Sequence, residues 1–68
     1  MINTNLLKRR MSEMRITQAE LAEYLDIATQ TMCQKINNIR PFSLEEANKV
    51  ALKLRIKDKE FGEYFFAN

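Results

Sequence analysis

The sequence predicts an all-α fold, a compact bundle of about five short helices in a single domain over residues 1–68. Apolar residues recur at helical spacing along the whole chain, and no stretch alternates convincingly as a strand would. Glycine and proline occur once each, so the corners between helices must be short. Two S/T-x-x-E segments, Thr17–Glu20 and Ser43–Glu46, have the capping-box pattern that marks the start of a helix.

The first two helices are predicted from apolar spacing and from the first capping box. The first helix is expected from Asn3 or Asn5 to Met14, with an inward stripe formed by Leu7, Met11 and Met14. The second begins after Thr17, at Gln18, and ends at Tyr24 or Leu25; its buried residues are expected to be Leu21, Ala22 and Leu25. A corner follows at Asp26, a residue type that tolerates the left-handed conformation.

The remaining helices follow the same logic. The third is expected over Ala28–Ile36, with Ala28, Met32 and Ile36 pointing inward, and a second corner falls at Asn37-Asn38. The fourth is expected over Leu44–Leu54; its apolar face would hold Leu44, Ala47, Val50 or Ala51, and Leu54. Asp58 is expected to cap a last short helix in an aromatic C-terminal segment, residues 58–68.

Composition argues against several function classes. The chain has no histidine and one cysteine, so we expect no internal disulfide, no metal site, no catalytic residues and no cofactor. No apolar run approaches the roughly 20 residues of a membrane-spanning helix, and we expect a cytoplasmic protein without a membrane partner. A chain this short leaves little room for a deep pocket, so no small-molecule ligand is expected. The net charge is +2, and the excess lies entirely within residues 1–42.

The outward side of the third helix carries the most informative residues. Gln30, Gln34 and Asn37 lie nearly opposite Met32 at 100° per residue, with Thr31 and Cys33 on the flanks. Glutamine can read adenine through two hydrogen bonds, and the major groove of B-DNA admits one helix. On composition alone, base readout and a merely hydrated face are equally good interpretations.

Residues 17–38, TQAELAEYLDIATQTMCQKINN, resemble the helix-turn-helix of the phage repressor/Cro-like family. The matching positions are Thr17-Gln18, Leu21-Ala22, Leu25, Ile27, Met32 and Ile36. Residues 40–47, RPFSLEEA, and the closing aromatic run through Phe65, Phe66 and Ala67 are similar to regulators of Gram-positive phages. The resemblance implies a lambda-repressor-like DNA-binding domain with its helix-turn-helix at 17–37. Where the family has glycine in its corners this chain has Arg15 and Asp26, and we expect the Arg15 corner to differ by one residue.

The resemblance also implies which residues contact DNA. Four stand where such proteins touch base edges, namely Thr29, Gln30, Cys33 and Gln34, and the two glutamines rank first. Six are expected to contact the DNA backbone, namely Gln18, Thr31, Lys35, Asn37, Asn38 and Arg40. Ala28 replaces the usual Ser or Thr cap, which predicts a loss of roughly 0.5–2 kcal/mol unless Thr29 starts the helix one residue later.

The expected function is therefore sequence-specific binding of double-stranded DNA by a Cro-like transcriptional repressor, in a bacterial host and associated with its nucleoid. One helix reads few base pairs, so we expect a homodimer, at least on DNA, on a palindromic operator with half-sites ~34 Å apart. Tyr64, Phe65 and Phe66 are possible dimer contacts, or else they close the core of the monomer. The alternative function is a protein-interaction module, such as an antitoxin or antirepressor-like domain.

Overall fold

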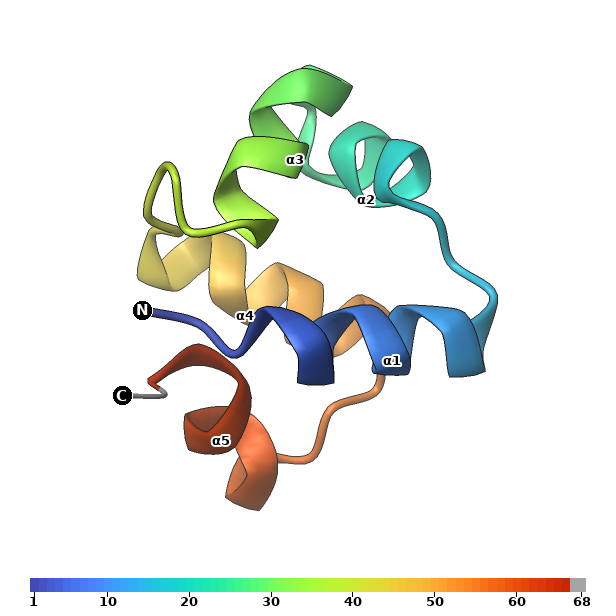
Figure 1. Cartoon of the computed structure of the whole chain (residues 1–68). Coiled ribbons are helices and arrows are strands. Elements are labelled where there is room, and N and C mark those ends of the chain that lie inside the picture. The colour runs from blue at the N-terminus through green and yellow to red at the C-terminus, as the bar shows by residue number, and fades with distance from the viewer. Residues whose placement is uncertain (67–68) are drawn as a thin grey trace.

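The computed structural model describes residues 1–66. Within them it has five α-helices and one short 3-10 helix, joined by short connections (Figure 1). Their bounds are α1 Thr4–Met14, α2 Gln18–Leu25, α3 Thr29–Ile36, α4 Leu44–Lys53, η1 Asp58–Glu60 and α5 Phe61–Phe65. No strand occurs within these residues, which confirms the all-α prediction. None of these helices has the length and apolarity needed to cross a membrane. Ala67 and Asn68, the end of the predicted segment 58–68, lie outside the described residues.

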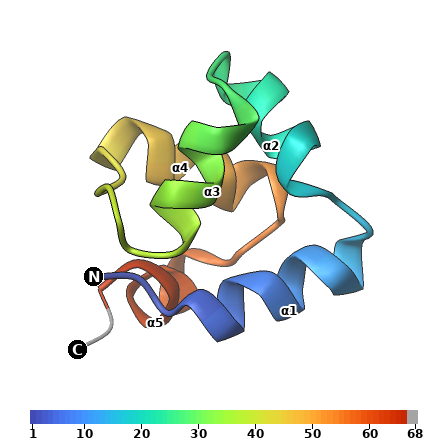
Figure 2. The same ribbon diagram turned by 45° about the horizontal axis from the view of Figure 1, so that its top comes forward.

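The helices are arranged so that α2 and α3 form one end of the molecule and α5 the other, with α1 and α4 between them (Figure 1). After a 45° turn, α3 lies in front of α4, and α5 still lies beside the start of α1 (Figure 2). The amide of Asn3 donates to the carbonyl of Tyr64 at 2.8 Å, which ties the first residues of the chain to α5. Because α3 lies at one end of the bundle, its outer face lies at the periphery of the molecule (Figure 1).

A single hydrophobic core receives residues from every α-helix. Its fully buried large side chains are Leu7, Leu21, Met32, Ile36, Val50 and Leu54. Tyr64 and Phe65 are also buried and close the core beneath α1. Two expected core residues are exposed instead: Ala28 precedes α3 as its N-cap, and Leu44 opens α4 with its side chain in solvent. Both stand at the N-terminal ends of their helices.

Both predicted capping boxes are confirmed. The Thr17 hydroxyl accepts from the amide of Glu20 at 3.1 Å while the Glu20 carboxylate accepts from the amide of Thr17, also at 3.1 Å. Ser43 and Glu46 make the same exchange at 3.1 and 2.9 Å. Ala28 gives α3 no side-chain cap, and α3 begins at Thr29. The expected cap at Asp58 is wrong: Asp58 lies inside η1, and neither η1 nor α5 has a side-chain cap.

Four corners share one backbone geometry. Each contains a residue in the left-handed region, and each such residue is followed by isoleucine: Arg15-Ile16, Asp26-Ile27, Asn38-Ile39 and Arg55-Ile56. Every one of these isoleucines donates its amide to the carbonyl five residues earlier, at 2.8–2.9 Å. This bond closes the end of a helix in the manner of a Schellman motif. The expectation that the corner at Arg15 would shift is therefore wrong, because Arg15 itself adopts φ 55°.

Candidate nucleic-acid interface

The outer face of α3 is held outward by the burial of its opposite face. Met32 and Ile36 are completely buried, and they fix the rotation of the helix about its axis. Thr29, Gln30 and Cys33 are consequently exposed, and Gln34 is half-buried beside them. These four predicted base-contacting residues occupy positions i, i+1, i+4 and i+5, which share one helix face. We call this set the α3 face.

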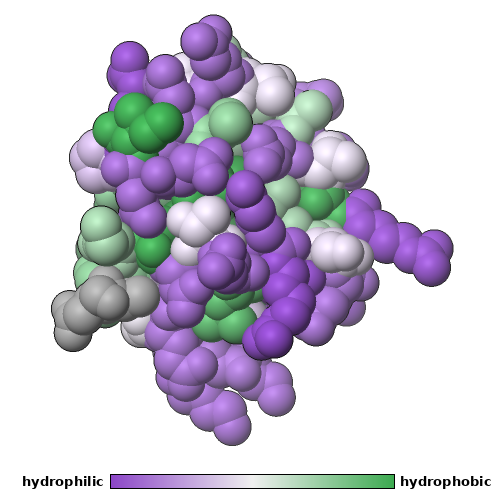
Figure 3. All heavy atoms as spheres, viewed as in Figure 1, coloured by the Kyte–Doolittle hydropathy of each residue, from purple (hydrophilic) through white to green (hydrophobic). Residues whose placement is uncertain are grey.

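No acidic residue interrupts this region. From Ile27 to Leu44 the sequence has two basic residues, Lys35 and Arg40, and no Asp or Glu. Hydrophilic side chains cover most of the surface seen in Figure 3, including the part over α3. The α3 face therefore offers amide, hydroxyl and thiol groups from a segment that contributes no negative charge of its own.

The start of α2 is less favourable to an anion than expected. Gln18 is half-buried in the first turn, where helix amides lack intrahelical acceptors. The Glu20 carboxylate occupies the cap, because its Oε1 atom accepts from the amide and hydroxyl of Thr17 at 3.1 and 3.2 Å. A phosphate at Gln18 would approach this negative charge, so the helix dipole alone does not make a strong site here.

Asn38 holds the fold together through its side-chain amide, and its expected contact with phosphate stays a prediction. Its side-chain oxygen accepts from the amide of Ile2 at 2.9 Å, and its Nδ2 atom donates to the Ile2 carbonyl at 3.1 Å. The hydroxyl of Thr4 donates to the carbonyl of Ile36 at 2.6 Å in the same place. The end of α3 is thus fastened to the start of the chain, and the Asn38 amide is already satisfied.

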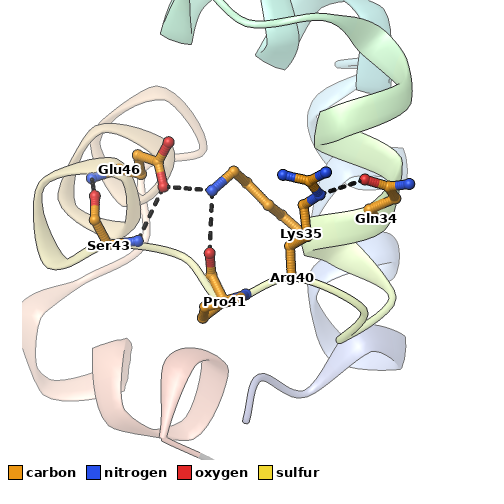
Figure 4. A network of polar contacts seen from close by, with 6 residues as sticks. All are labelled: Gln34, Lys35, Arg40, Pro41, Ser43 and Glu46. Carbon is orange, nitrogen blue, oxygen red and sulfur yellow. Dashed lines mark hydrogen bonds and ion pairs between the residues drawn. The ribbon is translucent and has the colours of Figure 1, made fainter.

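Lys35 is likewise engaged within the chain. Its Nζ atom donates to Glu46 Oε1 at 2.8 Å and to the Pro41 carbonyl at 3.0 Å (Figure 4). It also lies 5.9 Å from the centre of the Phe42 ring. The Lys35 side chain is only 13% exposed. Lys35 therefore fastens α3 to α4, and a phosphate contact at this position, which stays a prediction, would compete with these bonds.

The carboxylate of Glu46 connects the two helices electrostatically. Partial burial raises its pKa, but the hydrogen bonds from Lys35 and from the Ser43 amide outweigh this and lower the pKa below its ordinary value of 4.5. Glu46 therefore stays ionised at neutral pH while it caps α4 and holds Lys35. This double role was missed at the sequence level, where Glu46 was assigned only to the capping box.

Arg40 and Gln34, predicted to contact phosphate and base respectively, meet in the structure. Arg40 Nε donates to Gln34 Oε1 at 2.7 Å (Figure 4). Asn37 turns back onto α3 and donates to the carbonyl of Cys33 at 2.8 Å. Arg40 and Asn37 are exposed, whereas Thr31 and Gln18 are half-buried. These four residues remain available as backbone contacts.

A groove of about 510 Å³ adjoins this region between the first residues, the segment 40–44 and α5. Met1, Leu44 and Phe66 line it with largely exposed apolar side chains. Of the three possible dimer contacts, Tyr64 and Phe65 belong to the core, and Phe66 is 66% exposed. Phe66 therefore remains the one of the three with a side chain open to another molecule.

Comparison of the chain with models of protein families, with curated proteins and with solved structures gives no match. The function is accordingly inferred from the geometry of these residues.

Proposed function

We propose that this chain is a sequence-specific regulator that binds double-stranded DNA and inserts α3 into the major groove. The α3 face carries this proposal: it presents Thr29, Gln30, Cys33 and Gln34 outward from a helix whose other side is locked into the core. The resemblance of residues 17–38 to the helix-turn-helix of Cro-like regulators supports the same function. In that role the chain represses transcription by covering a promoter.

The dimensions of α3 suit a major-groove reader. A helix with its side chains is about 10–12 Å across, and the groove is about 12 Å wide. The eight residues of α3 span about 12 Å, which corresponds to roughly three to four base pairs at 3.4 Å each. So few base pairs give little specificity, and the proposal therefore includes a second copy of the chain.

A homodimer fits the repeat of DNA. The described chain measures 28 × 23 × 20 Å between Cα atoms. Two copies side by side, with their side chains, can place two α3 helices about 34 Å apart, one turn of B-DNA. Phe66, exposed beside the groove, is the proposed dimer contact.

Selection of bound sequences from random duplex DNA tests the proposal. The purified chain should enrich a palindromic motif with two short half-sites whose centres are about ten base pairs apart. Recovery of unbiased sequence at low salt, with folded protein in excess, would refute the proposal. Binding to the selected duplex should weaken steeply with salt, with a log–log slope of about −0.9 for each phosphate neutralised.

A protein-interaction module, of antitoxin or antirepressor type, is the second candidate function. The groove beside Met1, Leu44 and Phe66 favours it, because contiguous exposed apolar side chains suit a protein partner better than a phosphate. The salt dependence separates the two functions, since an apolar protein contact lacks the counterion release that makes DNA binding salt-sensitive.

A further inference from the structure

We infer that Arg40 fixes the orientation of the Gln34 side-chain amide and so makes Gln34 a reader of guanine rather than adenine. This inference rests on the proposed DNA-binding function. It replaces the sequence-level expectation, in which a free glutamine amide reads adenine with its oxygen and nitrogen together.

The backbone places Arg40 next to Gln34 before any ligand binds. The amides of Ile39 and Arg40 both donate to the carbonyl of Gln34, at 2.8 and 3.3 Å. The residues on either side are anchored as well: Asn38 is bound to Ile2, and the Pro41 carbonyl accepts from Lys35. Arg40 is therefore an exposed residue in a turn that is fastened before and after it, and its side chain starts from a fixed position.

The chemistry of the pair then orients the amide. A guanidinium group has only donors, so the atom of Gln34 that meets Arg40 Nε at 2.7 Å must be the carbonyl oxygen. The Gln34 Nε2 group is left on the other side of the amide with two N–H donors, as Figure 4 shows. The Nη groups of Arg40 have no hydrogen-bond partner within residues 1–66, so they are free to reach a phosphate while Nε holds the glutamine.

This orientation selects against adenine. Adenine offers the N7 acceptor but also the N6 amino donor, which needs the glutamine oxygen. Arg40 Nε already uses one lone pair of that oxygen, and the adjacent positive guanidinium repels a further N–H group. Guanine offers two neighbouring acceptors, N7 and O6, which match the two donors of Gln34 Nε2. A good pair of such bonds discriminates against the wrong base by a factor of roughly 5 to 150.

The test is selection from random duplex DNA with four proteins, the unchanged chain and the variants Q34A, R40A and R40K. The position that loses its preference in Q34A is the one that Gln34 reads, and competition binding then gives the guanine-to-adenine ratio there. The unchanged chain should favour guanine. R40A and R40K should each lower the ratio at least fivefold, and R40K should retain the salt dependence because its charge can still contact phosphate.

R9A is the matched control, since Arg9 is exposed on α1 and its loss removes the same charge. It should leave the guanine-to-adenine ratio unchanged. A preference for adenine in the unchanged chain, a ratio that survives both R40A and R40K, or an equal effect of R9A would overturn the inference while leaving DNA binding intact. The absence of any enriched motif with the unchanged chain would overturn the proposed function itself.

Discussion

The ion pair between Lys35 and Glu46 should contribute measurably to folding, because it joins α3 to α4 where both side chains are largely shielded. The Nζ–Oε1 distance is 2.8 Å, and the side chains are 13% and 23% exposed. Exposed pairs contribute about 0.2–1 kcal/mol, whereas breaking a fully buried pair costs about 3–5 kcal/mol. A double-mutant cycle with K35M and E46Q should therefore give a coupling energy of about 1–2 kcal/mol, measured by urea unfolding at neutral pH.

The chain contains its own control for this cycle. Lys49 and Glu45 lie 3.5 Å apart on α4 with side chains 49% and 80% exposed. Their coupling should not exceed about 0.5 kcal/mol, the usual contribution of an exposed i,i+4 pair. Equal coupling energies for the two pairs would refute the reasoning, because shielding from solvent would then have no effect on the strength of an ion pair.

The same pair predicts the sign of a pH dependence. Glu46 has a lowered pKa in the folded chain, so folding is favoured by its ionised form. Its contribution is fully present above the ordinary value of 4.5 and is lost as the pH falls through the lower, folded-state pKa. The stability difference between the unchanged chain and E46Q should shrink over that acidic range in urea titrations. A difference that grew with acid would contradict the assigned pKa direction.

Three further predictions concern single side chains. R15G should raise the unfolding free energy by about 0.5–1 kcal/mol. The strain energy relieved at the left-handed Arg15 is larger than the free-energy cost of the extra entropy that glycine gives the unfolded chain. A lower thermal midpoint would contradict this prediction. L21A should lower the free energy of unfolding by about 2–5 kcal/mol, which is most of the stability of a domain this small. Its circular dichroism spectrum at 25 °C should be that of a largely unfolded chain. A folded spectrum would mean that the core collapses around the cavity. F66S should leave the melting curve nearly unchanged and weaken dimerisation on the operator in sedimentation experiments; unaltered dimerisation would remove Phe66 from the interface.

Much of the fold follows from local signals in the sequence. The box from Thr17 to Glu20 fixed the start of α2, and the periodicity of Leu21, Ala22 and Leu25 fixed its buried face. Periodicity describes one helix at a time, however, and contains no information on where the neighbouring helices end. For this reason Leu44 has the correct angle for burial but lies in solvent.

The sequence also contains a signal for the geometry that closes the helices. A polar or charged residue followed by isoleucine stands after four predicted helices, as in Arg15-Ile16 and Asp26-Ile27. In each pair the first residue adopts the left-handed conformation, and the amide of the isoleucine donates to the helix carbonyl five residues earlier. Ile39 is the exception in one respect, because it is 70% exposed beside Arg40.

The site was predictable only where it depends on the α3 helix itself. Burial of Met32 and Ile36 implies exposure of Gln30 and Cys33, and the structure has this arrangement. The roles of Lys35 and Asn38 depend on partners distant in sequence, such as Glu46 for Lys35, and single-sequence periodicity cannot supply these. The sequence alone could not show that these two side chains already have partners within the chain.

Cys33 offers the most direct test of the claim that the α3 face meets DNA, because it is the chain's one cysteine and its side chain is exposed on that face. The measurement is the rate of Cys33 alkylation by iodoacetamide, with and without a saturating amount of the selected duplex. An unrelated duplex at high salt is the control, since it carries the same phosphates without the motif. If α3 lies in the major groove, the selected duplex should slow alkylation by at least about tenfold, in proportion to the fraction bound. An unchanged rate at saturation would contradict the account and would place the DNA on another face of the molecule.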